Sequence, residues 1–418
     1  MRIATLQFAP KLGDVEGNIR RANEILARGK TISSYPRGTL NSVFGTCLSA
    51  DIEQLRPDVL VLPELALTGY NFPSAEAIKP FLEPAGTGPS AEWARETAKR
   101  LNCKVCIGYP EIETLKDGDT ESTKYYNSLL IVNEHGEVLQ NYRKCFLYFT
   151  DETWAAEGNV ERGFHELEFR SRDAQRESAT AATDLVGNIR REGNADASEV
   201  RQKENDVHVR PDALSSEQEP LSYQGKVATS FGICMDINPY KFEAPFTAFE
   251  FASRVFDSRS QLVILSMAWL TMHDRAALAA LKDNPDMETF NYWLQRFMPL
   301  MEKEMQHARN VDEKDGEARS PSTQLRQKPK QVVIVFANRS GEEPAADDTK
   351  PPALYAGTST VLTVTQRAGS ESREGVQAEN QMEVKILCWD QLGAQEEGIC
   401  FADTTADPKM VFGIRRVK

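Results

Sequence analysis

Histidine and cysteine are both scarce in this sequence, and this scarcity limits its chemistry. Five histidines and seven cysteines are scattered over 418 residues. The odd number and wide spacing of the cysteines provide no disulfide framework and indicate a reducing, intracellular compartment. The histidines form no H-x-x-x-H or C-x-x-H pattern, so we expect no metal centre. Cys103 and Cys106 lie three positions apart on a predicted strand and face opposite sides of it, so we expect both to pack in the core.

Long apolar runs and an excess of positive charge are also missing. No apolar run approaches the roughly 20 residues that span a bilayer, and the opening MRIATLQFAP alternates like a strand rather than a secretion signal. Lys and Arg number 49 against 62 Asp and Glu, a net charge of −13. This charge argues against nucleic acid or an anionic membrane as the main partner. We therefore predict a cytoplasmic protein.

Two common functional motifs are absent. Neither G-x-x-x-x-G-K-S/T nor G-x-S-x-G occurs, so the sequence has no Walker-type phosphate loop and no serine nucleophile elbow. Gly86 and Gly88 resemble the start of a dinucleotide loop, but Ala91 stands where the third glycine belongs. We therefore expect no cofactor.

Aromatic residues are missing from residues 170–219. This segment has few large apolar residues and many charges of both signs. Such a composition buries too little apolar surface to offset the entropy of ordering, so we expect a disordered insert. A tolerated surface loop is the simpler interpretation, and an interaction segment is the alternative. Strand and helix patterns continue on both sides of it, so we predict one domain over residues 1–418.

The remaining sequence alternates between strand and helix patterns. Continuous apolar runs such as DVLVLP are typical of strands covered on both faces. The predicted strands span 3–8, 58–63, 104–109, 125–132, 137–142, 226–234, 261–266, 331–338, 358–365 and 382–388. The predicted helices lie around 19–26 and at 89–101, 243–256 and 287–307. Alternating strands and helices together with antiparallel pairs indicate an α/β layered protein.

Three reactive side chains each follow a predicted strand. Glu64 stands in the context LPE, Lys144 in YRK and Cys234 in GICMD. Open α/β sheets place their active sites beyond the carboxyl ends of the strands. Alone, each residue has a plainer explanation, namely a helix-capping glutamate, a solvated lysine or a small buried cysteine.

In combination the three residues suggest one reaction. Burial raises the pKa of a glutamate and makes it a better general base. An ammonium stabilises an oxyanion, and a thiolate beside a base or a cation is a nucleophile. No histidine lies at a comparable position, so a Cys–His pair is poorly supported. A Glu64–Lys144–Cys234 arrangement is the remaining way to activate the thiol.

At these residues the chain resembles the nitrilase superfamily of carbon–nitrogen hydrolases. Further similar segments are RIATLQFAPKLGDVEGNI near the start, LTGY at 67–70, LSMAWL at 265–270 and NRSGEE at 338–343. Met267 is a departure, because relatives often carry Asn there. The resemblance implies a four-layer α-β-β-α sandwich that is usually dimeric, so a homodimer is expected.

Two segments, YRKCFLYFTDETW and GICMDINPYKFEAPFTAFEFA, most resemble the fungal-type amidases that act on protein N-termini. This resemblance implies a partner, a protein or peptide whose N-terminal residue is Asn or Gln. It also implies a reaction, hydrolysis of that side-chain amide to Asp or Glu with release of ammonia through a cysteine thioester. The product would enter the arginylation branch of the N-degron pathway.

The resemblance also assigns roles to the matching residues. Glu64 would be the general base, Lys144 the oxyanion stabiliser and Cys234 the nucleophile. The backbone N–H of Met235 would be a second oxyanion donor. Glu152 would be the supporting acid that follows the lysine by eight residues in some amidases.

Recognition of an N-terminal residue requires acceptors for its α-ammonium group. The candidates are Asp236, Asp151 and Glu343, and Asp236 is preferred because it lies two residues after the nucleophile. Equally, Asp236 could serve only to fix the turn through an Asx bond. Tyr70 and Trp269 are expected to line the pocket, although Trp269 could belong to the core.

Two rival functions are left open by the sequence. One is a small-molecule amidase of the same superfamily, of the ω-amidase or carbamoylase type. The other is a non-catalytic binding protein that keeps the fold. Substrate size tests the first alternative, and titration of Cys234 with a thiol reagent tests the second.

Overall fold

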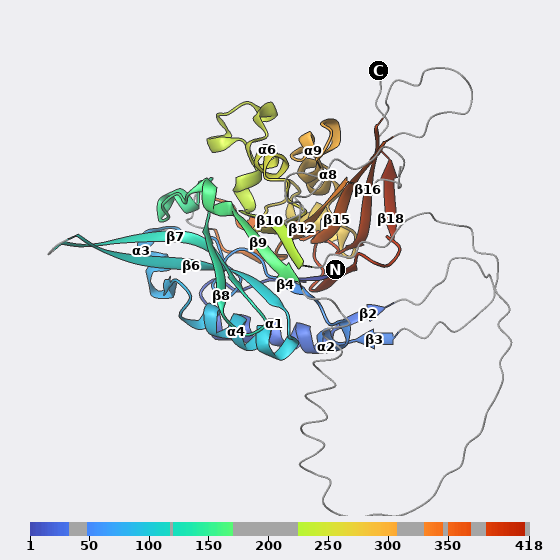
Figure 1. The fold of residues 1–418 in the computed structure, drawn as a ribbon. Coiled ribbons are helices and arrows are strands. Elements are labelled where there is room, and N and C mark those ends of the chain that lie inside the picture. Colours follow the sequence, from blue (N-terminus) through green and yellow to red (C-terminus); the bar gives the residue numbers. More distant parts are fainter. Residues whose placement is uncertain are drawn as a thin grey trace, which may run out of the picture.

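The computed structural model describes residues 1–32, 48–117, 120–169, 225–306, 330–345, 350–368 and 382–413 (Figure 1). The predicted insert at 170–219 lies outside these residues. Within them, no helix is both long and apolar enough to cross a membrane. All ten predicted strands are confirmed, and eight more short or edge strands join them. Most bounds shift by a few residues, but the strand predicted at 104–109 extends to Asp117 and the one predicted at 125–132 begins at Thr120.

One seven-stranded sheet contains the amino-terminal strands, in the order β17-β1-β4-β6-β7-β8, with β5 paired to β6. Its centre is parallel, because β1 pairs with β4 and β4 with β6 in the same direction. The outer pairs β1–β17, β6–β7 and β7–β8 are antiparallel. The strands are β1 (Arg2–Gln7), β4 (Val59–Val61), β5 (Glu83–Pro84), β6 (Lys104–Asp117), β7 (Thr120–Val132), β8 (Val138–Arg143) and β17 (Gly398–Asp403).

A second seven-stranded sheet has the order β18-β16-β15-β12-β11-β10-β9. Here β10, β11 and β12 form the parallel centre. The strands are β9 (Phe164–Phe169), β10 (Gly225–Ile233), β11 (Leu262–Ser266), β12 (Lys330–Ala337), β15 (Thr360–Ala368), β16 (Met382–Gln391) and β18 (Met410–Gly413). Two small ribbons are β2 (Lys30–Ile32) with β3 (Leu48–Ala50), and β13 (Glu342–Glu343) with β14 (Ala353–Leu354).

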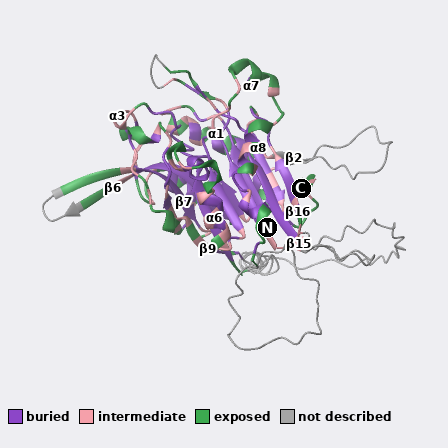
Figure 2. Cartoon of the chain, turned by 90° about the horizontal axis from the view of Figure 1, so that it is seen from above, coloured by how far each residue is buried: buried purple, intermediate pink, exposed green. Residues whose placement is uncertain are grey.

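The two sheets pack face to face, and helices cover their outer faces, which confirms the predicted α-β-β-α sandwich (Figures 1 and 2). Alternation along β1 shows the principle: Ile3 belongs to the core between the sheets, whereas Ala4 belongs to the core under the helices. Helices α1 (Val15–Arg28) and α4 (Pro89–Leu101) cover the first sheet. The second is covered by α6 (Glu250–Asp257), α8 (Met287–Gln295) and α9 (Pro299–Glu302).

The C-x-x-C pair obeys the same alternation. Cys106 contributes to the core between the sheets and Cys103 to the core beneath the helices. Burial is the largest cause of the raised pKa of each thiol. Both cysteines therefore pack in the core, as expected.

Two predicted helices are shorter than expected. The pattern at 287–307 breaks after α8, and α9 starts at Pro299, because proline cannot donate the hydrogen bond that a continuous helix needs. The helix predicted at 243–256 begins only at Glu250, since Phe249 adopts a left-handed conformation with φ 47°. The remaining small helices are α2 (Ile52–Leu55), α3 (Ala75–Ile78) and α7 (Arg275–Leu281).

Candidate active site

The three predicted catalytic side chains lie where strands of both sheets end. Glu64 follows β4 and Lys144 directly follows β8 of the first sheet, and Cys234 directly follows β10 of the second. The relative exposure is 0% for Glu64, 0% for Lys144 and 8% for Cys234. The close approach of β6 fixes the backbone at Glu64, because a Cβ atom on Gly108 would lie 2.7 Å from its Cα. The sandwich thus brings residues from distant parts of the chain to one buried place.

Glu64 and Lys144 form a direct ion pair. The Lys144 Nζ atom donates to Oε1 of Glu64 at 2.6 Å. The other carboxylate oxygen, Oε2, accepts the backbone N–H of Ala268 at 2.8 Å. This second bond crosses from one sheet to the end of β11 on the other, so the Glu64 carboxylate is fixed at both oxygens.

A second carboxylate completes the environment of Lys144. Its Nζ also donates to Oδ2 of Asp151 at 2.6 Å. The same oxygen accepts the Tyr148 N–H at 3.0 Å and the Tyr70 hydroxyl at 3.2 Å. Lys144 therefore lies between two buried carboxylates.

Asn127 also joins the two carboxylates. Its Nδ2 group donates to Glu64 Oε1 at 2.7 Å and to Asp151 Oδ1 at 2.9 Å. Its backbone carbonyl also accepts the N–H of Lys144 at 2.8 Å. Sequence reasoning missed this residue; the available signal was a lone amide within the predicted apolar strand 125–132.

Glu152 was predicted to be the supporting acid, but the acid that contacts Lys144 is its neighbour Asp151. The side chain of Glu152 is exposed, whereas that of Asp151 is fully buried. The segment forms a short 3-10 turn at Asp151–Thr153 that points one carboxylate inward and its neighbour outward. Spacing from Lys144 alone could not distinguish these adjacent acids.

Cys234 occupies a strained turn beside this cluster. Its φ of 42° lies in the left-handed region that disfavours non-glycine residues, and it is the first residue of a 3-10 turn, Cys234–Ile237. The thiol interacts electrostatically with Glu64 and Lys144. The structure thus brings all three predicted residues together.

The protonation states follow from burial and charge. Burial raises the pKa of Glu64, although Lys144 opposes the shift. Burial and then the charge of Glu64 raise the pKa of the Cys234 thiol well above its usual range. For Lys144 burial acts the other way, but Asp151 and Glu64 outweigh it and raise its pKa. The site therefore holds a protonated thiol, a permanent ammonium and a carboxylate suited to accept a proton.

Tyr70, Met235 and Trp269 were predicted to contact substrate. Tyr70 is buried, and its ring lies 5.5 Å from the Lys144 Nζ. Met235 follows the nucleophile within the 3-10 turn and is buried. The backbone N–H of Trp269 donates to Asn338, and its ring packs 6.0 Å from Trp293 in the core. Tyr70 and Met235 therefore adjoin the catalytic group, while Trp269 is partly committed to packing.

Asp236 cannot offer a vacant oxygen to an α-ammonium group. Both of its oxygens already accept two protein donors each. The structure therefore supports the alternative prediction, in which Asp236 fixes the turn. It does not support the preferred prediction, in which Asp236 binds the α-ammonium group of the substrate. Glu343 is similarly occupied, by the Tyr70 and Asn71 N–H groups, the Tyr355 hydroxyl and Arg339.

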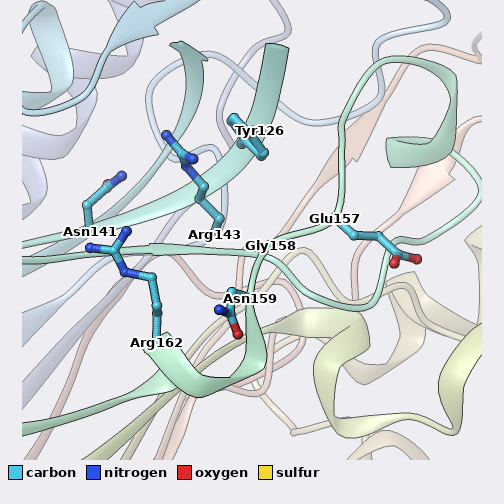
Figure 3. Close-up of a pocket in the computed structure, with 7 residues that line it drawn as sticks. All are labelled: Tyr126, Asn141, Arg143, Glu157, Gly158, Asn159 and Arg162. Carbon is cyan, nitrogen blue, oxygen red and sulfur yellow. The ribbon is translucent and has the colours of Figure 1, made fainter. Parts of the chain in front are cut away.

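A separate cavity of about 320 Å³ lies beside the strand that leads to Lys144 (Figure 3). Arg143 lines it but is held by Glu111 and by the ring of Tyr126, 3.8 Å from its Cζ. None of the three catalytic candidates lines this cavity. Its lining residues are Tyr126, Asn141, Arg143, Glu157, Gly158, Asn159 and Arg162. Among the residues that the structure describes, no group of three or more His, Cys, Asp or Glu side chains could hold a metal ion.

Residues 2–187 match the carbon–nitrogen hydrolase family. The matched range includes Glu64 and Lys144 and ends before Cys234. The protein N-terminal amidase of Saccharomyces cerevisiae is 28% identical over 356 residues, which cover 72% of this chain and 64% of that protein. The chain therefore spans less than two thirds of the length of that relative.

Two further matches cover a larger share of the other protein. The protein N-terminal amidase of Schizosaccharomyces pombe is 27% identical over 379 residues, 88% of this chain and 92% of that protein. A crystal structure of an N-terminal amidase with a Gln-Val peptide has a TM-score of 0.59 and 23% identity, and the match covers 100% of this chain and 99% of that one. At this identity the structural likeness concerns the fold.

Proposed function

We propose that this chain is a carbon–nitrogen hydrolase of the nitrilase superfamily, as the match over residues 2–187 indicates, and that it is an amidase for protein N-termini. Its substrate is a protein or peptide whose first residue is Asn or Gln, and its products are the corresponding Asp or Glu and ammonia. The observation that carries the proposal is the buried contact of Lys144 with Glu64 beside the strained Cys234. The similarity to the protein N-terminal amidases of two yeasts supports the substrate class.

The reaction begins with transfer of the Cys234 thiol proton to Glu64. The sulfur attacks the carboxamide carbon, and the oxyanion is stabilised by the Lys144 ammonium and by the Met235 N–H. Glu64 returns its proton to the leaving nitrogen, so ammonia departs and a thioester remains. Water then attacks the thioester while Glu64 accepts a proton, and the thiol is released with the new carboxylate.

Ammonia release from an Asn-initiated peptide tests the proposal. We expect the wild-type chain to release ammonia and Cys234→Ala to release none. Cys103→Ala is the matched control, because that thiol is buried beneath the helices of the first sheet and away from the catalytic group. Equal release by Cys234→Ala and the wild type would refute the assignment.

The choice of substrate distinguishes this function from that of a small-molecule amidase. Acetylating the peptide N-terminus removes the α-ammonium charge, so we expect cleavage of the acetylated peptide to be lost. Free amides and ureido acids should be poor substrates. Equal rates on free and acetylated peptides would identify an amidase with a different substrate.

The location of the chain, its oligomeric state and its pathway are also proposals. We propose that the chain acts in the cytoplasm as a homodimer and supplies N-terminal Asp or Glu to the arginylation branch of the N-degron pathway. The net charge of −13 supports a partner other than nucleic acid. Light scattering of the purified chain tests the dimer directly.

A further inference from the structure

We propose that Asp236 is a positioning residue that fixes the catalytic cysteine relative to the catalytic lysine. It follows Cys234 by two residues and is fully buried. Its carboxylate makes no hydrogen bond with either reacting side chain, but it accepts the backbone N–H before Cys234 and the two backbone N–H groups that follow Lys144. The roles of Cys234 and Lys144 are those of the proposed function, on which this inference rests.

On the side of the nucleophile, Asp236 closes the turn that contains Cys234. The N–H of Ile233, the residue before the cysteine, donates to Asp236 Oδ2 at 2.7 Å. This bond spans the left-handed Cys234, whose φ is 42°. A strained backbone persists only where its surroundings determine it strongly, so the carboxylate helps to hold the thiol in place.

On the side of the lysine, Asp236 binds three residues that lie within two positions of Lys144. Oδ1 accepts the N–H of Cys145 at 3.0 Å and that of Phe146 at 2.8 Å. Oδ2 accepts the Tyr142 hydroxyl at 2.8 Å. A single side chain thus connects the end of β10 in one sheet to the end of β8 in the other.

The requirement is for a carboxylate specifically. All four partners are donors, and an ionised carboxylate is the side chain that offers only acceptors. An amide at this position would place its NH₂ group against donors. The connection would then open, and the distance between thiol and ammonium would change.

Asp236→Asn tests the inference in the full-length chain. A displacement of about 1 Å in a catalytic group costs on the order of 100-fold, so we expect kcat per folded molecule to fall by about that factor with KM changed less than about threefold. Asp257→Asn, which alters an exposed aspartate in α6, is the matched control and should leave kcat unchanged. A folded Asp236→Asn variant with unchanged kcat would overturn the proposal.

Alkylation of Cys234 by iodoacetamide gives a second readout that needs no substrate. The charge of Lys144 lowers the pKa of the thiol. If Asp236→Asn displaces the lysine, the midpoint of the alkylation profile should rise, by on the order of half a pH unit. Simple loss of the negative charge of Asp236 would instead lower the midpoint, and that result would contradict positioning. This arm stays decisive even if the wild type releases no ammonia.

Tyr142→Phe provides the test if Asp236→Asn fails to fold. This variant removes one of the four donors and leaves the carboxylate in place. We expect kcat to fall by about three- to tenfold with KM preserved, because the connection is loosened rather than broken. An unchanged kcat in Tyr142→Phe together with an unchanged alkylation midpoint would refute the inference.

Discussion

At the scale of single residues, the unusual feature is that Lys144 has two carboxylate partners. Its Nζ lies 2.6 Å from Glu64 and 2.6 Å from Asp151. A base held by a lysine alone would be a weak proton acceptor, since the ammonium favours its ionised form. Asp151 offsets this effect, because its charge raises the pKa of Glu64. The pair of acids therefore keeps the lysine charged and the base reactive at the same time.

Asp151→Asn should impair the reaction through this balance. Without the second charge the pKa of Glu64 falls, so the acidic limb of kcat/KM against pH should move to lower pH while the maximal rate drops by about 10- to 100-fold. Glu152→Gln is the matched control, because its side chain is exposed. If Glu152→Gln reduced the rate as much as Asp151→Asn, the assignment of the inner acid would be wrong.

Asn127→Leu should move the same limb in the opposite direction. The Asn127 hydrogen bond lowers the pKa of Glu64, so its loss raises that pKa. We expect the acidic limb to shift upward by on the order of half a pH unit. A pH–rate profile of the variant measures this shift, and a limb that stays in place would show that Asn127 does not tune the base.

Some features of the individual site residues could be predicted from the sequence, and others could not. The order Glu64, Lys144 and Cys234 could be recognised because each residue follows a predicted strand. The choice between Asp151 and Glu152 was not, because it depends on how a 3-10 turn is oriented. Three of the four partners of Asp236 come from residues about 90 positions earlier in the chain, so no local pattern reveals them.

At the scale of elements, α4 shows how distant contacts replace a local cap. The N-cap of this helix is Gly88, which makes no side-chain capping bond. The anchoring acceptor is instead Glu83 of β5, which accepts the Ser90 N–H at 3.0 Å and its hydroxyl at 2.7 Å. Apolar spacing predicted the helix itself, but a partner on another element could not be read from it.

Glu83 gives α4 a pH-dependent attachment. Burial raises the pKa of this carboxyl from 4.5 to about 7. The folded state therefore binds the proton more tightly than the unfolded state, and its stabilising contribution is lost as pH rises from about 4.5 to about 7. Relative to wild type, Glu83→Gln should gain about 1–3 kcal/mol of unfolding free energy between pH 5 and pH 8. Urea unfolding at both pH values measures this gain, and a pH-independent difference would contradict the mechanism.

At the scale of the whole molecule, two sheets are built from strands far apart in the chain. β1 pairs with β17, so Arg2 lies opposite Asp403. Apolar runs predicted the individual strands, since buried parallel strands are continuously hydrophobic. They could not predict which strands pair, because pairing depends on long-range contacts. The resemblance to a family supplied the sandwich that periodicity alone left undefined.

The register of β9 and β10 leads to a prediction about the insert at 170–219. Phe169 pairs with Gly225 across these antiparallel strands, so the two ends of the segment outside the described residues are already adjacent. A turn of about four residues can connect such ends, and shortening a long loop reduces the entropy lost on closure by about 0.6 kcal/mol per halving. Replacing residues 170–224 with such a turn should therefore leave kcat/KM within about twofold and should not lower the melting temperature.

The outcome of this deletion decides between the two interpretations of the insert. The strand β10 leads directly into Cys234, so an insert that only extends a hairpin end remote from the nucleophile should not affect the chemistry. A folded deletion variant that loses more than about tenfold in kcat/KM on a protein substrate, but not on a short peptide, would assign the insert a role in binding large substrates. Equal losses on both substrates would place it in contact with the active site. Full activity on both would identify it as a tolerated extension of the hairpin.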